Sequence, residues 1–326
     1  MSSPSLSTMS APIAEEMERF RKIFKTSIRS DAPLVDMIAR YLLKRKGKKM
    51  RPMLVLLAAS AAGGVTERTH RGAVLVELLH TATLVHDDVV DDADVRRGFP
   101  SVNAVWKNKA AVLMGDFLLA RGLQLAMEGK DFDFLEIVTD AVRRMSVGEL
   151  RQIQKARKLD IDEPTYFKIV SDKTASLILT CCEIGALSAG EDATRRAALG
   201  EYGEALGVAF QIRDDALDFD GSFKRFGKPI GGDVKEKKIT LPLIYALDDA
   251  DEKEAKRVRK LVKNGKKRGA VSEVVRFTRE GKGLRKAEAK AREYGDRAKA
   301  ALDALPDTPA KTSLRNLVDF ALTRDR

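Results

Sequence analysis

The sequence predicts an all-α fold, and three observations support this prediction. Only 6% of the 326 residues are aromatic, whereas Ala, Leu, Glu, Lys and Arg, which favour helices, recur throughout the chain. Proline is sparse, at 10 residues. Glycine and proline breaks divide the chain into segments that are mostly of helical length. Because 44% of the residues are hydrophobic, a chain of this length can bury a sizeable core.

The breaks predict the order of the elements. They fall near Gly47, Gly63-Gly64, Gly98 to Pro100, Gly129 to Asp133, Pro164, Gly190, Gly221 to Gly232, Gly265, Gly281-Gly283 and Pro306 to Pro309. No fixed-period repeat or Pro-rich linker divides the sequence, so we expect residues 13–326 to form one helical domain. Residues 1–12 (MSSPSLSTMSAP) are rich in Ser and Pro and lack the basic start and apolar core of a signal peptide. We expect them to be a disordered tail.

Composition also limits which cellular compartment and which classes of binding partner are expected. Cys181 and Cys182 are adjacent in an apolar stretch, so they cannot form a disulfide framework and indicate a reducing compartment, the cytoplasm. The longest near-apolar run, Met53 to Val65, is shorter than the roughly 20 residues of a membrane span. The net charge of +11 fits nucleic acid, an anionic membrane or a polyanionic substrate. The sequence has no zinc-finger spacing and no basic motif interleaved with aromatic residues, which disfavours nucleic acid.

A buried helix that ends in carboxylates is the first functional signal. Residues Ala73 to Val85 are apolar nearly all round, which predicts a helix inside the bundle. Asp87, Asp88 and Asp91 follow in a DDxxD pattern. Asp87 and Asp91 are one helical turn apart, so two like charges share a face. Hard divalent cations are the usual compensation for such clustered carboxylates.

A second acidic cluster repeats this spacing. Asp214, Asp215 and Asp218 follow the apolar run Ala205 to Ile212, and Gln211 lies one turn before Asp214. One triplet alone could be a solvated helix end. Two copies, each closing an apolar helix, indicate metal ions held between facing helices. Such ions need further oxygen ligands, which a diphosphate would supply.

Basic residues near these clusters would balance the charge of a diphosphate. Each alone is more simply a solvated surface residue, but together with two acidic triplets they favour a polyanionic substrate. His80, two turns before Asp87, is either a core histidine or a diphosphate contact through its ring N–H. The basic candidates, with one threonine beside them, are Lys48, Lys49, Arg51, Arg96, Arg97, Lys173, Thr174, Lys228 and Lys238.

At these motifs the sequence resembles the trans-isoprenyl diphosphate synthases, and most closely their long-chain, octaprenyl-type members. The two aspartate motifs, the paired arginines, the Lys-Thr pair and the GKPxGxD and KxTLP segments occur in the family's order. The match runs from about Lys46 to the C-terminus. Departures include Lys49, where the family usually has arginine, and Lys237, where it usually has glycine.

The resemblance implies an isoprenoid synthase-type helical bundle around a central cavity, a homodimer, and Mg²⁺ as the cofactor, with three ions per site when diphosphate is bound. It implies metal binding by Asp87, Asp88, Asp91, Asp214, Asp215 and Asp218. It assigns catalysis to Asp87, Asp91, Lys173, Asp214 and Lys238. Isopentenyl diphosphate would be held by Lys48, Arg51, His80 and Arg97. The allylic diphosphate would be held by Arg96, Lys173, Thr174, Gln211, Lys228 and Lys238.

The resulting prediction is a long-chain trans-polyprenyl diphosphate synthase, which condenses isopentenyl diphosphate with a farnesyl-type allylic primer in isoprenoid or quinone side-chain biosynthesis. Ala82 and Thr83 are small and lie roughly 6 to 7.5 Å below Asp87, so we expect an open channel for the growing chain. Its floor would lie within Val112 to Met127. Alternatively, these small residues only permit close helix packing.

Competing functions are a short-chain farnesyl or geranylgeranyl diphosphate synthase, a terpene cyclase, and a non-catalytic subunit of the same fold. The second DDxxD copy argues against the cyclase, and the complete set of acidic and basic residues argues against the subunit. The basic surface leaves peripheral membrane contact, for product release, as an open alternative.

Overall fold

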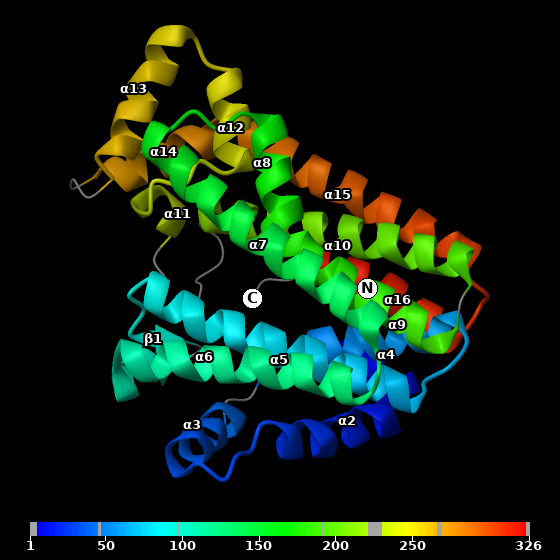
Figure 1. The fold of residues 1–326 in the computed structure, drawn as a ribbon. Coiled ribbons are helices and arrows are strands. Elements are labelled where there is room, and N and C mark those ends of the chain that lie inside the picture. Colours follow the sequence, from blue (N-terminus) through cyan, green and yellow to red (C-terminus); the bar gives the residue numbers. More distant parts are fainter. Residues whose placement is uncertain are drawn as a thin grey trace.

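Helices make up almost all of the described chain, which confirms the predicted all-α fold (Figure 1). The computed structural model describes residues 5–44, 47–96, 98–190, 192–220, 230–265 and 269–323. The α-helices are α1 (Leu6–Ser10), α2 (Ala14–Ser27), α3 (Pro33–Lys44), α4 (Met50–Ala62), α5 (Glu67–Val90), α6 (Val102–Glu128), α7 (Phe132–Lys158), α8 (Glu163–Val170), α9 (Ser176–Ala189), α10 (Ala193–Phe219), α11 (Gly232–Lys235), α12 (Leu241–Asp248), α13 (Glu252–Lys263), α14 (Ala270–Glu280), α15 (Gly283–Ala301) and α16 (Pro309–Thr323). The short helical turns are η1 (Ala11–Ile13), η2 (Ser171–Ala175) and η3 (Leu302–Ala304). Two short strands, β1 (Val95–Arg96) and β2 (Phe99–Pro100), pair in an antiparallel hairpin.

The two helices that carry the acidic motifs begin at well-formed caps. α5 begins with a capping box, in which the side chains of Thr66 and Thr69 each bond the other residue's backbone N–H. α10 begins at Asp192, whose carboxylate accepts a hydrogen bond from the N–H of Arg195. Both helices are surrounded by others, α5 by α6, α4 and α9, and α10 by α15 and α9. This explains why the stretch from Ala73 to Val85 in α5 and the stretch from Ala205 to Ile212 in α10 are apolar on nearly every side.

The buried side chains form two hydrophobic clusters. One involves α2, α4, α5, α6, α9 and α16, and includes Phe20, Leu56 and Leu78. The other involves α8 and α10 to α15, and includes Phe219 and Val258. In Figure 1 the α5–α6 layer lies below, and α8 with α11 to α14 lies above. The first motif therefore ends a helix of one cluster, whereas the second ends α10, whose C-terminal half belongs to the other.

The N-terminal segment corrects one prediction. Residues 5–12 belong to the fold, although the composition of residues 1–12 predicted a disordered tail. Ser5 caps α1 by accepting a hydrogen bond from the N–H of Thr8, Pro12 lies in the first turn of η1, and Met9 is fully buried. Ser and Pro are enriched in disordered chains, but they are also the residues that start helices. That dual use explains the error.

By length and composition alone, α6 could cross a membrane, and core helices of soluble proteins pass the same test. About a third (33%) of its most apolar window is buried within this chain. The helix packs against α5 on one side and leaves an apolar face uncovered on another.

Candidate active site

The first aspartate motif closes α5. The helix ends at Val90 and Asp91 is its C-cap, so Asp87 and Asp91 lie one turn apart at the helix end. Both side chains are exposed. Asp88 is 1% exposed, and its carboxylate accepts a hydrogen bond from Nε of Arg96 in the β1–β2 hairpin. The hairpin therefore holds the middle aspartate and leaves the outer two accessible.

Asp87 lies in a partly desolvated environment, even though its side chain reaches solvent. This desolvation raises the pKa of Asp87, while the positive charges of Lys173 and Arg96 act in the opposite direction. The negative charge of Asp91 raises the pKa further. Lys173, which lies some 86 residues further along the chain, is thus close enough for its charge to act on the first motif.

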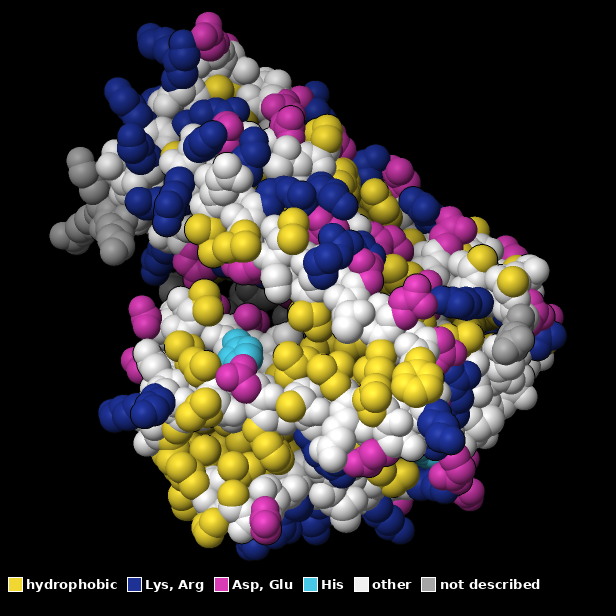
Figure 2. All heavy atoms as spheres, in the orientation of Figure 1, with side chains coloured by type: hydrophobic (Ala, Val, Ile, Leu, Met, Phe, Trp, Pro, Cys, Tyr) yellow, Lys and Arg dark blue, Asp and Glu magenta, His cyan; other side chains and the backbone are white. Residues whose placement is uncertain are grey.

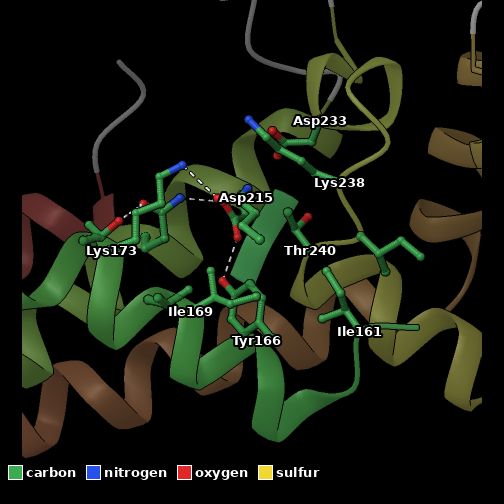
Figure 3. Close-up of a pocket in the computed structure, with 13 residues that line it drawn as sticks. Ile161, Tyr166, Ile169, Lys173, Asp215, Asp233, Lys238 and Thr240 are labelled. Carbon is green, nitrogen blue, oxygen red and sulfur yellow. Dashed lines mark hydrogen bonds between the residues drawn. The ribbon is translucent and has the colours of Figure 1, made fainter. Parts of the chain in front are cut away.

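The second aspartate motif is more deeply integrated into the protein. Asp215 is 5% exposed, and its carboxylate accepts hydrogen bonds from the Tyr166 hydroxyl and from Nε2 of Gln211, each at 2.7 Å (Figure 3). Burial and the neighbouring charge of Asp233 raise the pKa of Asp215 well above its ordinary value, although both hydrogen bonds oppose this. This aspartate pays a desolvation penalty that a bound cation would relieve.

Asp218 links the second motif to the next helix. Its two carboxylate oxygens accept hydrogen bonds from the N–H groups of Gly232, at 3.2 Å, and Asp233, at 3.0 Å. The N-cap of α11, Gly231, has no side chain, so Asp218 performs the capping role from a distant part of the sequence. The segment that follows α11 carries Lys238, whose N–H donates to the carbonyl of Asp233 at 2.8 Å. Asp218 therefore helps to position Lys238.

The surroundings of both motifs fit a divalent cation. Each lies at the C-terminal end of a helix, where the unpaired carbonyl groups make further negative charge unfavourable. Oδ2 of Asp88 is buried with no hydrogen-bond partner among the described residues. Among all the residues that the structure describes, no three acidic, His or Cys side chains are grouped closely enough to hold a metal ion by themselves. These carboxylates suit an ion that takes its remaining oxygen ligands from a bound diphosphate.

Residues predicted to hold the allylic diphosphate meet in one cavity of about 190 Å³. It is lined by Lys173, Thr174, Gln211, Asp215 and Lys238 (Figure 3). Nζ of Lys173 donates to Oε1 of Gln152 at 2.8 Å and pairs with Glu149, and the Thr174 hydroxyl donates to Gln211 at 2.9 Å. Burial opposes the charge of Lys238, but Glu236, Asp233 and Asp91 outweigh it and raise its pKa. Lys238 is therefore a cation at neutral pH.

Next to this cavity, the protein surface has a hollow, which Figure 2 shows above the α5–α6 layer. Acidic side chains lie at its edge. An adjoining pocket of about 560 Å³ is lined by Asp91 of the first motif and by Lys238, which also lines the cavity beside Asp215 of the second motif.

The structure brings together part of the predicted isopentenyl diphosphate site. Nη1 of Arg51 lies 2.8 Å from Nε2 of His80, which is buried on α5. Lys49 donates to Glu77 at 2.7 Å. Lys48 is exposed, and its ammonium group lies 5.3 Å from the centre of the Phe320 ring. Arg97 and Lys228, also predicted to bind diphosphate, lie outside the described residues.

The two predicted chain-length residues lie on α5, below the first motif. Ala82 is 2% exposed, and the Thr83 hydroxyl donates to the carbonyl of His80 at 2.9 Å. Their part in product length stays a prediction.

Sequence reasoning missed several residues of the cavity. Tyr166, Gln152 and Asp233 line it, and Tyr166 binds the second motif directly. For one of them, Tyr166, helical spacing could have predicted a place in the cavity. Tyr166 lies seven residues before Lys173, two turns earlier on a nearly continuous helix.

Comparisons with known proteins agree with this geometry. Residues 32–278 match the family model of polyprenyl synthetases. An octaprenyl diphosphate synthase from Escherichia coli is 35% identical over 313 residues, which cover 96% of this chain and 97% of that protein. The crystal structure of a decaprenyl diphosphate synthase from Rhodobacter capsulatus has a TM-score of 0.93 and 35% identity, covering 99% of this chain and 100% of that one. A polyprenyl synthase from Caulobacter crescentus, crystallised with calcium and isoprenyl diphosphate, has a TM-score of 0.92 and 33% identity, with both chains covered fully.

An all-helical fold with two acidic motifs and a set of cations around one cleft defines a prenyltransferase that acts on diphosphate esters. With the match over most of its length, the chain belongs to the polyprenyl synthetase family.

Proposed function

We propose that this enzyme is a long-chain trans-polyprenyl diphosphate synthase, which adds isopentenyl diphosphate repeatedly to an allylic diphosphate primer. The observation that carries the proposal is the cavity where Lys173 and Lys238 meet Asp215 of the second motif. The octaprenyl and decaprenyl synthases that resemble the chain over nearly its full length support a long product.

The residues of the cavity suggest how the reaction proceeds. Lys173 and Lys238 lie where they can stabilise the negative charge that develops on the departing diphosphate. As the allylic C–O bond breaks, Ile169 and Val170 in the cavity wall keep water from the cation. The double bond of isopentenyl diphosphate attacks that cation and forms the new C–C bond. A proton is then lost to restore a double bond, and the released diphosphate accepts it.

We propose Mg²⁺ as the cofactor, with the ions held by the aspartates of the two motifs. When bound, it would supply Lewis-acid stabilisation of the diphosphate. The calcium in the Caulobacter crescentus structure supports a divalent ion in this family.

Incubation with labelled isopentenyl diphosphate, farnesyl diphosphate and Mg²⁺, followed by chromatography of the product lengths, tests the function. We expect a long polyprenyl diphosphate, and no product when a chelator removes the metal. A farnesyl- or geranylgeranyl-length product would identify a short-chain synthase instead. No product from folded protein with any allylic primer would identify a non-catalytic subunit.

Product length can also be tested at Ala82 and Thr83. If the growing chain passes them, Ala82→Phe or Thr83→Phe should shorten the product to farnesyl or geranylgeranyl length while the first condensation continues. An unchanged product distribution in both active variants would show that these residues only permit close helix packing.

We also propose that the enzyme is a homodimer that forms through α6 and the adjoining face of α7. Leu113 of α6 is 58% exposed and Leu150 of α7 is 66% exposed, and Figure 2 shows extensive hydrophobic surface over these helices. Apolar surface of this extent is characteristic of association sites. Leu113→Glu should yield a monomer in analytical ultracentrifugation, whereas Leu34→Glu, on the exposed part of α3, should leave a dimer. A monomeric wild-type protein would contradict this assembly.

The cytoplasm is the compartment we propose, supported by the free, buried thiols of Cys181 and Cys182. Membrane contact for product release would use the exposed lysines of α13, such as Lys256 and Lys263. Co-sedimentation with anionic vesicles tests that contact, and its absence at physiological salt would contradict it.

A further inference from the structure

The helix that carries Lys173 and Thr174 is interrupted. Residues Ser171–Ala175 form a π-helical turn, η2, between α8 and α9. Such wide turns are rare and often occur at functional sites. Two adjacent residues of this turn act on different acidic motifs. The charge of Lys173 acts on Asp87, and Thr174 donates to Gln211, which donates to Asp215.

Asp172, the residue before this pair, is held by cations on the other side of the turn. It is 3% exposed. Nη1 of Arg151 lies 2.7 Å from its Oδ2, and Nζ of Lys168 lies 3.1 Å from its Oδ1. Arg144 reaches the same carboxylate at 3.4 Å and also donates to the carbonyl oxygen and the hydroxyl of Ser171, at 3.2 and 2.9 Å. Two arginines of α7 thus fix the first two residues of the π-turn.

Two glycines hold the same turn by close packing. A Cβ atom on Gly148 of α7 would lie 3.0 Å from both Cβ of Asp172 and the backbone N of Lys173. A Cβ atom on Gly207 of α10 would lie 2.5 Å from Cα of Ala175. The absence of side chains at these positions lets α7 and α10 touch the backbone of the turn from two sides.

We propose that Asp172 is a positioning residue for the allylic diphosphate. With Arg144 and Arg151 it fixes the π-turn so that Lys173, labelled in Figure 3, and Thr174 line the cavity. The Asp172 carboxylate itself bonds to cations outside the cavity lining. This role rests on the proposed function, because the two residues that it positions are those assigned to the allylic diphosphate.

Asp172→Asn tests this role, because it keeps the size of the side chain and removes the charge that attracts both arginines. We expect the KM for the allylic diphosphate to rise about tenfold, because a shift of positioning groups by about an ångström weakens productive binding. The KM for isopentenyl diphosphate should stay within about twofold of wild type. Calorimetry with a non-reacting allylic thiolodiphosphate should show the same loss of affinity. Asp140→Asn, the same change at an exposed carboxylate of α7 that pairs with Arg143, should alter neither constant.

Gly148→Ala is the second variant, and it decides the question if Asp172→Asn does not fold. Its new Cβ would press on the π-turn and should give the same selective rise. Gly295→Ala introduces a comparably close contact between α15 and α16, 2.6 Å from Cδ1 of Leu322, and should not. Equal rises in both KM values, or wild-type constants in the folded variants, would overturn the positioning role. Inactive wild-type protein in the same assay would instead overturn the proposed function.

Discussion

The first aspartate motif leaves its outer carboxylates accessible, whereas the second is built into the fold. Asp87 and Asp91 are exposed at the end of α5. Asp215 and Asp218 are each 5% exposed, and they accept hydrogen bonds from a tyrosine, a glutamine and two backbone N–H groups. Identical spacing puts the same carboxylates on one helix face in both motifs. The neighbouring residues decide which of those carboxylates also support the structure.

The largest expected effect is on turnover, and here the two motifs should behave alike. Asp87→Ala, Asp91→Ala and Asp214→Ala should each lower turnover by about two to three orders of magnitude, because stabilisation of the leaving diphosphate is lost. Steady-state assays at saturating Mg²⁺ measure this, with circular dichroism to verify the fold. Asp140→Ala, at an exposed acid of α7, should retain full activity. Near-wild-type turnover in a folded motif variant would contradict the assignment of that aspartate.

The two motifs should differ in how much their aspartates contribute to the free energy of unfolding. Asp218→Ala removes the acceptor of two backbone N–H groups at α11, which should lower the free energy of unfolding by about 1–2 kcal/mol, as for the loss of an N-cap. Asp91→Ala should leave it nearly unchanged, because the bond that joins Asp91 to Asp87 is made by the backbone. Chemical denaturation of the metal-free variants measures both. Equal losses in the two variants would show that the motifs are not structurally different.

The smallest expected effect is the change of stability with pH that depends on the middle aspartate of each motif, Asp88 or Asp215. Burial raises the pKa of Asp215 in the folded state, so its contribution to stability is complete below the ordinary pKa of an aspartate and is lost as the pH rises through the raised value. In metal-free protein, the melting temperature of Asp215→Asn relative to wild type should therefore increase from acidic to neutral pH.

Asp88→Asn is the matched variant in the first motif. It removes the negative charge that pairs with Arg96 and leaves only a neutral amide oxygen as the acceptor, so it should lower stability at neutral pH. Thermal melts in chelator at a series of pH values measure both variants. A difference between Asp215→Asn and wild type that does not change with pH would contradict the effect of burial on Asp215.

Much of the fold could be predicted from composition and breaks, because helix formers and the Gly and Pro residues that end helices act locally. Pro164 lies in the first turn of α8, and the break at Gly129 to Asp133 separates α6 from α7. The β1–β2 hairpin could not be predicted, since strands of two residues have no periodicity. The kink in α6, at Lys107 with φ of 70°, has no Gly or Pro to indicate it.

The sequence predicts the parts of the site that depend on residue type and local spacing. It does not predict the contacts that depend on packing between distant segments. Spacing predicts that Asp214, Asp215 and Asp218 lie close together. It does not predict that Tyr166 binds Asp215 or that Asp218 caps α11, because those partners lie far away in the sequence. The pairing of Arg96 with Asp88 is also a tertiary contact.

The π-turn at Ser171–Ala175 makes this stretch sensitive to length as well as to residue type. A π-turn holds one residue more than an α-helical turn, so deleting one residue there would restore a regular α-helix and leave the orientation of α9 relative to α8 largely unchanged. The side chains of α9 would then keep their packing against α4, and the change would fall on the residues of the turn itself. Among related sequences, an alignment gap of one residue inside this segment should therefore mark a protein that lacks the wide turn and presents its Lys-Thr pair differently to the cavity, even if every acidic residue is still present.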